Sequence, residues 1–173
     1  DPALTDDGAL DALRARLDEL GLVPVMETGA RYLLDPSAKH EPTLMTRDDG
    51  ARGRRVAFYG RVAEMGRRLG AEVVSFWAGV DHAPGPDSAD RLLHGVAAAC
   101  AAIRAHGLCP SFEPEPGMAI ETVGQYEQLC GELGDDAPAL TLDVGHLYAA
   151  WEGEPVDVIA RAAPHLAQVH LED

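Results

Sequence analysis

The stretch Leu142-Asp143-Val144-Gly145-His146 is the most informative for the fold. It ends a short apolar segment with residue types that bind metal ions, and two other segments of the chain end in the same way. Phe112-Glu113-Pro114 precedes it and Val169-His170-Leu171 follows it, each about one strand and one helix away. Parallel α/β barrels gather the C-terminal ends of successive strands around one pocket. We therefore expect Glu113, Asp143 and His170 to converge as a site for a divalent cation such as Mn²⁺, Mg²⁺, Co²⁺ or Zn²⁺.

Strand-like and helix-like segments alternate along the chain, and no boundary divides it, so we expect one domain over residues 1–173. Apolar spacing with a helical period predicts helices over 10–20, 55–69, 89–106, 123–133 and 156–163. Short apolar segments predict strands over 23–27, 72–77, 108–113, 139–143 and 167–172. This alternation indicates a parallel sheet with right-handed crossovers.

The alternation of side chains within the strands favours a closed barrel over an open sheet. In four of five strands a polar residue lies two positions before the last inward residue, as the floor of a pocket requires. These inward pairs are Val25 and Glu27, Ser75 and Trp77, Ser111 and Glu113, Thr141 and Asp143, Gln168 and His170. The residues between them are apolar and should face outer helices: Val74, Phe76, Phe112, Leu142 and Val169.

Composition excludes several classes of protein. The net charge of −15 would repel a phosphate backbone, so we expect no nucleic-acid partner. No apolar run is long enough for a bilayer and the N-terminus has no leader pattern, so we expect a cytoplasmic protein with no membrane partner. The three cysteines are not at zinc-site or redox spacing, which indicates reduced thiols.

A long polar loop follows the strand over 23–27, and loops of that length are usually functional or disordered. It carries Lys39, the single lysine among 14 cationic side chains, next to His40. Barrel geometry places Glu27, Lys39 and His40 over the same face as Glu113, where Lys39 would meet a phosphate or carboxylate. The alternative is that they are surface charges. Trp77 ends its strand, either as an apolar wall against a sugar ring or as a core tryptophan.

His146 follows Asp143 by three residues, so a continuing strand would point the two to opposite faces. We expect Gly145 to let the backbone turn and return His146 to the pocket. The alternative is a solvent-facing residue at a helix N-terminus.

With these motifs placed, the chain resembles the xylose-isomerase-like superfamily of TIM barrels, which includes sugar-phosphate isomerases and epimerases, inosose dehydratases, ketose epimerases and apurinic endonucleases. The most specific part runs from Pro110-Ser-Phe-Glu-Pro-Glu-Pro-Gly117 through residues 142–146 to 169–173, and is similar to the fifth, sixth and seventh strands of such barrels. The resemblance implies a parallel (β/α)8 barrel of which this chain, as a fragment, covers about strands 3 to 7. The open edges of such an arc predict self-association, and a homo-oligomer stays open.

The resemblance also implies roles for individual residues. Glu113, Asp143 and His170 would bind one divalent metal, and a fourth ligand, a glutamate, would follow on the eighth strand. Glu113 would double as an acid/base group, while His146 would touch the substrate and polarise its oxygen. Glu172 shares a face with His170, and Asp173 would orient a ligand or cap a helix, although neither is expected to bind the metal directly.

The function that these features favour is a metal-dependent isomerase or epimerase. The metal would bind adjacent carbonyl and hydroxyl oxygens of a sugar, a sugar phosphate or a related polyol carbonyl compound, and a carboxylate would transfer a proton through an enediolate. Two alternatives remain. One is phosphodiester hydrolysis of the apurinic-endonuclease type, against which the acidic charge argues. The other is a non-catalytic sugar-binding barrel, which predicts no metal.

Overall fold

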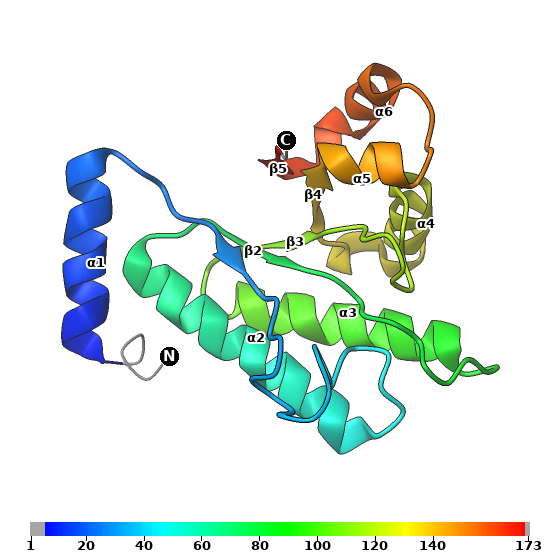
Figure 1. Ribbon diagram of the computed structural model, residues 1–173, viewed down its shortest axis with the longest axis horizontal. Coiled ribbons are helices and arrows are strands. Elements are labelled where there is room, and N and C mark those ends of the chain that lie inside the picture. The colour runs from blue at the N-terminus through cyan, green and yellow to red at the C-terminus, as the bar shows by residue number, and fades with distance from the viewer. Residues whose placement is uncertain (1–5, 172–173) are drawn as a thin grey trace.

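The structure is a computed structural model that describes residues 6–171. Its strands are all parallel and are paired in chain order: β1 (Met26–Glu27), β2 (Val73–Phe76), β3 (Cys109–Phe112), β4 (Ala139–Asp143) and β5 (Leu166–His170). The sheet curves strongly, so that β4 and β5 rise away from the plane of β2 and β3 (Figure 1). These five strands form a half-barrel, as the sequence predicted.

Helices alternate with the strands along the chain. They are α1 (Asp7–Leu20), α2 (Asp49–Leu69), α3 (Ser88–Arg104), α4 (Val123–Leu133), α5 (Val144–Ala149) and α6 (Pro155–Ala162), with short 3-10 turns over Gly134–Asp136 and Ala163–His165. Figure 1 shows α2 and α3 side by side under β2 and β3. Within residues 6–171, no helix combines the length and the apolarity needed to cross a bilayer.

The predicted start of α2 at residue 55 was wrong, because the helix begins six residues earlier at Asp49. Asp48 caps it by accepting a hydrogen bond from Ala51 N at 2.7 Å. The first turns contain two glycines and three arginines, so they lack the apolar period on which the prediction depended. Gly70 ends the helix with a φ of 74°, as a left-handed cap requires.

The sequence analysis missed α5, which begins directly after β4 with no loop between them. Asp143 makes this transition, because its side chain accepts hydrogen bonds from the backbone N–H groups of Gly145 and His146. The edge strands are shorter than predicted. Pro24 has no N–H to donate, and β1 pairs with β2 only through Met26 and Glu27. Strand β5 ends at His170.

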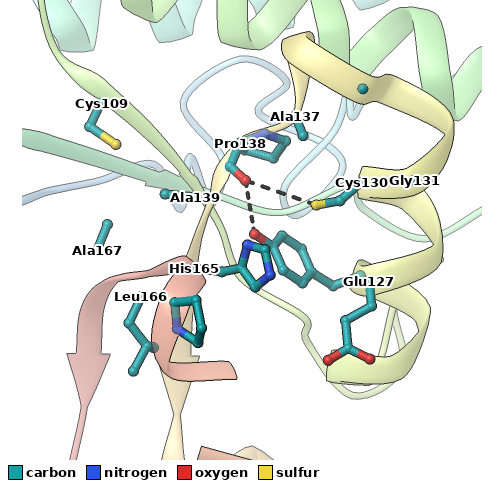
Figure 2. Close-up of a pocket in the computed structure, with 13 residues that line it drawn as sticks. Cys109, Glu127, Cys130, Gly131, Ala137, Pro138, Ala139, His165, Leu166 and Ala167 are labelled. Carbon is teal, nitrogen blue, oxygen red and sulfur yellow. Dashed lines mark hydrogen bonds between the residues drawn. The ribbon is translucent and has the colours of Figure 1, made fainter. Parts of the chain in front are cut away.

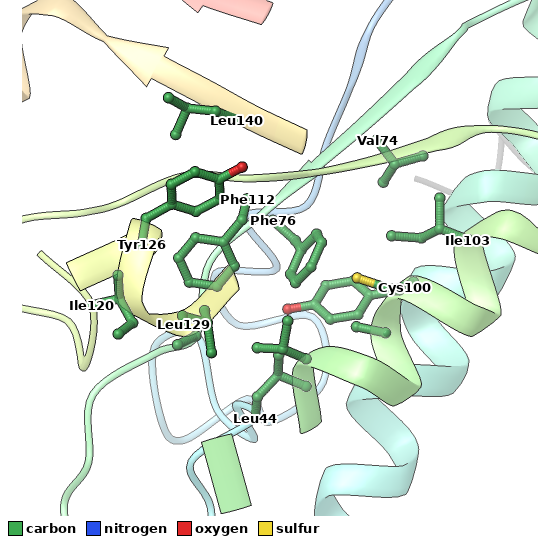
Figure 3. Close-up of a cluster of buried hydrophobic side chains, with 14 of the residues drawn as sticks. Leu44, Val74, Phe76, Cys100, Ile103, Phe112, Ile120, Tyr126, Leu129 and Leu140 are labelled. Carbon is green, nitrogen blue, oxygen red and sulfur yellow. The ribbon is translucent and has the colours of Figure 1, made fainter. Parts of the chain in front are cut away.

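The core lies between the convex face of the sheet and the helices (Figure 3). Four aromatic rings cross it in succession, with centroids 5.4 Å apart for Tyr59 and Phe76, 5.5 Å for Phe76 and Phe112, and 6.3 Å for Phe112 and Tyr126. Four of the five residues predicted to face the helices are buried: Val74, Phe76, Phe112 and Leu142. Val169 is half exposed, because it lies on the edge strand β5.

Candidate active site

Three polar side chains meet where β3, β4 and β5 end. Glu113 follows β3 and stays in the sheet because its N–H donates to Phe76 O at 2.9 Å. Asp143 and His170 are the last residues of β4 and β5 and face each other in the sheet register. One carboxylate oxygen from each acid and one nitrogen of His170 all lie within 4.8 Å of one another. Glu172 and Asp173 lie outside the described residues.

The imidazole of His170 lies between the acids of both halves of the sheet. Its Nδ1 is 3.1 Å from Glu113 Oε1 and 3.8 Å from Asp143 Oδ2. Its Nε2 is 3.1 Å from Oε1 of Glu27, at the end of β1. Strands β1 and β5 are the two edges of the described sheet, so this contact exists because the sheet curves.

Asp143 uses its two oxygens for two purposes. Oδ1 accepts hydrogen bonds from Gly145 N at 2.7 Å and His146 N at 3.2 Å, which caps α5. Oδ2 points to the site, 3.9 Å from His146 Nε2. The turn that was expected at Gly145 is therefore the first turn of α5. This turn keeps His146 beside Asp143.

His146 lies between the segment after β3 and the start of α5. Its Nδ1 is 3.2 Å from Pro114 O, so Nδ1 carries a proton and donates to this carbonyl. Its Nε2 is 4.0 Å from Glu115 Oε1. Glu115, Glu113 and His146 form a second group whose donor atoms lie within 4.8 Å of one another. The sequence analysis missed Glu115, although prolines keep the backbone extended and residues two apart then share a side.

The site has an excess of buried negative charge. Glu113 is 6% exposed and Asp143 is 4% exposed, and no arginine or lysine among the described residues forms an ion pair with either. Burial raises the pKa of Glu113 to about 7, although the neighbouring His170 opposes the shift. Burial lowers the pKa of His170, but the carboxylates of Glu113 and Glu27 outweigh it, and the net shift is upward. Carboxylate and imidazole donors with uncompensated negative charge suit a divalent cation.

The comparisons with known proteins agree with this geometry. A family model described as xylose isomerase-like TIM barrel matches residues 1–173. The chain belongs to this family. No curated protein matches it significantly.

Solved structures of xylose isomerase-like barrels show the same fold. An L-ribulose 3-epimerase aligns with a TM-score of 0.78 at 20% identity, over 95% of this chain and 55% of its own. A D-psicose 3-epimerase with D-tagatose, from Clostridium cellulolyticum H10, gives 0.77 at 17%, over 97% and 58%. A 3-keto-D-glucoside 4-epimerase from E. coli gives 0.75 at 15%, over 96% and 65%. This chain therefore spans about 55–65% of the length of these barrels and forms part of one.

The structure separates Lys39 from His40 and Trp77, which were predicted to lie over the same pocket of this xylose isomerase-like barrel. Trp77 is only 7% exposed, and the ring of His40 meets it edge-on at 5.2 Å. His40 Nδ1 accepts a hydrogen bond from Arg31 N at 3.2 Å, and burial, followed by the charge of Lys39, lowers the pKa of His40. The side chain of Lys39 is exposed. Trp77 and His40 thus pack together, whereas Lys39 points to solvent.

Arg55, which the sequence analysis did not single out, is fully buried beneath this loop. Its guanidinium donates to Tyr59 Oη at 2.9 Å, to Thr28 O at 3.0 Å and to His40 O at 3.5 Å. It also lies 4.8 Å from the centroid of the Trp77 ring. Arg55 therefore fixes the loop and Trp77 together. The signal for it was an arginine on the apolar face of a predicted helix.

A cavity of about 690 Å³ lies at the other end of the strands, away from the acidic site (Figure 2). Cys109 and Leu166 begin β3 and β5 there, and Tyr126 donates to Pro138 O at 2.8 Å beside it. None of the predicted site residues lines this cavity. The chemistry-bearing residues and this cavity therefore occupy opposite ends of the half-barrel.

Proposed function

We propose that this protein is a divalent-metal-dependent isomerase or epimerase that acts on a sugar, a sugar phosphate or a related polyol carbonyl compound. The observation that carries the proposal is the convergence of Glu113, Asp143 and His170 within 4.8 Å at three adjacent strand ends. Family membership and the sugar epimerases among the structural neighbours support it.

Glu113, Asp143 and His170 would hold the cation in this proposal. Their donor atoms are two carboxylate oxygens and one imidazole nitrogen, without a thiolate, which suits Mn²⁺, Mg²⁺, Co²⁺ or Zn²⁺. When bound, the cation supplies a Lewis acid that polarises a substrate carbonyl and makes the neighbouring C–H group more acidic.

Glu113 would move the proton in the reaction. The proton leaves the carbon next to the carbonyl for the Glu113 carboxylate, giving an enediolate-type form of the substrate. In an isomerisation Glu113 returns the proton to the neighbouring carbon. An epimerisation needs a second acid on the opposite face, the role that the resemblance gives to the eighth-strand glutamate. In the metal-free protein burial raises the pKa of Glu113 to about 7, so its carboxylate is a stronger base than that of an exposed glutamate. Because Glu113 is buried, bulk water has little access to the carboxylate that would carry the proton.

His146 would orient a substrate oxygen through Nε2. Its Nδ1 proton is already donated to Pro114 O. In the neutral ring Nε2 can therefore only accept a hydrogen bond, for example from a substrate hydroxyl. Nε2 can donate a hydrogen bond to the substrate only when the ring is protonated. Trp77 and His40 would form an apolar wall beside the sugar, and the exposed Lys39 would meet a phosphate or carboxylate on a longer substrate.

Two measurements test this function together. Elemental analysis and Mn²⁺ titration of the protein should show one bound divalent ion. Proton NMR in D₂O should show deuterium entering D-fructose or D-tagatose at a carbon next to the carbonyl, and the labelled carbon separates epimerase from isomerase chemistry. Glu113→Gln should slow this exchange by about 10²–10⁴-fold, because it removes the proton carrier.

Glu64→Gln removes the same charge from an exposed position on α2 and should leave exchange unchanged. Equal exchange in Glu113→Gln and wild type would reassign the acid/base role. A protein without metal binding would fit the non-catalytic sugar-binding barrel. The apurinic-endonuclease alternative is disfavoured by the net charge of −15, which would repel a phosphodiester backbone.

A further inference from the structure

Glu27 is the acidic side chain on the outer side of His170. The Nδ1 edge of the imidazole faces Glu113 and Asp143, while Nε2 lies 3.1 Å from Glu27 Oε1. Because the two ring nitrogens point in opposite directions, one edge of the ring faces the proposed metal centre and the other faces Glu27. The side chain of Glu27 is 48% exposed, so it does not share the buried position of Glu113.

Histidines that bind metals usually donate their second ring N–H to a carboxylate, which fixes the tautomer and the direction of the ring. We infer that Glu27 is a positioning residue that orients His170 by accepting a hydrogen bond from Nε2. The inference rests on the proposed metal centre. It assigns Glu27 to the histidine, whereas a contact with the substrate was expected from the sequence.

Gln168 supports this role because it holds Glu27 in place. Its Nε2 donates to Glu27 Oε1 at 2.8 Å and also contacts His170 Nε2. The bond to Glu27 comes from the amide nitrogen of Gln168, whose Oε1 is buried and has no hydrogen-bond partner among the described residues.

Curvature of the sheet makes this arrangement specific. Glu27 ends β1 and His170 ends β5, at opposite edges of the described sheet, yet their side chains touch. Glu27 would therefore transmit the position of the first described strand to the proposed metal ligand on the last one. Removal of Glu27 would free the ring to rotate and to exchange tautomers.

The test measures Mn²⁺ affinity by titration, using the EPR signal of free Mn²⁺, in wild type, Glu27→Ala, Glu27→Gln and Asp143→Asn. We expect Glu27→Ala to weaken binding by about 10–100-fold. Glu27→Gln keeps a carbonyl acceptor for Nε2 and should restore most of the affinity. Glu72→Gln, which removes an exposed acid just before β2, should bind like wild type.

A second readout is the ¹⁵N spectrum of His170 in the Zn²⁺-loaded protein. It should show a single tautomer protonated at Nε2 in wild type, and a mixture or a changed ring environment in Glu27→Ala. Unchanged affinity and spectrum in Glu27→Ala, with binding lost in Asp143→Asn, would overturn the role of Glu27 alone. Equal losses in Glu27→Gln and Glu27→Ala would make Glu27 a direct ligand instead. Absence of binding in wild type, or full binding in Asp143→Asn, would overturn the metal centre and this inference with it.

Discussion

The half-barrel buries charge of both signs near the same strand ends, but in two different ways. The guanidinium of Arg55 is fully buried, and its partners are neutral: two backbone carbonyls, a tyrosine hydroxyl and aromatic faces. The carboxylates of Glu113 and Asp143 are almost as buried, and among the described residues the nitrogen groups beside them are the imidazoles of His146 and His170. The guanidinium of Arg55 is thus hydrogen-bonded by fixed, neutral protein groups. The two carboxylates have no arginine or lysine as a partner among the described residues.

This difference separates a structural charge from a functional one. The hydrogen bonds of Arg55 all go to neutral groups, and none of the ion pairs among the described residues includes Arg55. A buried charge that fixed dipoles satisfy stabilises one arrangement of the chain. A buried charge that stays uncompensated favours binding of an ion of opposite sign.

The largest change in the free energy of unfolding should follow from removing the buried charge of Arg55. Arg55→Met leaves the carbonyls of Thr28 and His40 without their donor and should lower the free energy of unfolding by about 2–4 kcal/mol in urea titrations. Arg61→Met changes an exposed arginine of the same helix and should cost less than about 0.5 kcal/mol. A loss of Mn²⁺ affinity in folded Arg55→Met, with normal stability, would contradict the structural role.

The second effect is the stabilisation of the folded protein when a divalent cation binds to Glu113, Asp143 and His170. Mn²⁺ at about 100 times its Kd should raise the free energy of unfolding by about 2.7 kcal/mol, since it binds only the folded site. Thermal unfolding with EDTA or with Mn²⁺ measures this increment. Arg55→Met should show the same increment from a lower baseline, and Asp143→Asn should lose it. An equal increment in Asp143→Asn would place the ion elsewhere.

The third effect concerns pH in the metal-free protein. The pKa of Glu113 rises from its usual 4.5 to about 7 on folding, so the folded state binds a proton that the unfolded state has released. At about 1.4 kcal/mol per pKa unit, stability should therefore fall by about 3 kcal/mol as the pH rises across this interval. The raised pKa of His170 acts in the same direction, because its ion pairs weaken as the pH rises through its folded value.

Urea unfolding in EDTA at several pH values checks this trend. Glu113→Gln should remove most of the decline, because its amide does not titrate. Parallel stability curves for wild type and Glu113→Gln would show that Glu113 does not titrate differently in the two states.

The sequence predicted the elements that have a strong apolar period. The bounds of α4 and β4 match the predicted 123–133 and 139–143. Prediction failed where capping decides the element, as at the glycine- and arginine-rich start of α2 and in α5, which depends on the Asp143 side chain. An apolar period in the sequence reveals helices that pack on a core. It does not reveal helical turns that are held by the hydrogen bonds of a single capping side chain.

The site was predictable where it depends on strand order. Glu113, Asp143 and His170 each end a strand, so parallel pairing alone brings them together. The contact of Glu27 with His170 joins residues 143 positions apart and depends on sheet curvature, which no local pattern encodes. Arg55 was missed for a similar reason, because its burial depends on the loop that folds over it.

The double use of Asp143 has a consequence for the choice of ion. Its Oδ1 is occupied by two backbone N–H groups, so only Oδ2 is available, and the carboxylate cannot turn both oxygens toward one cation without uncapping α5. Calcium sites draw on bidentate carboxylates and six to eight oxygens at long distances, whereas magnesium and manganese accept single oxygens in compact shells. The helix that begins at Val144 would thereby limit the denticity of the proposed metal site and disfavour the larger ion.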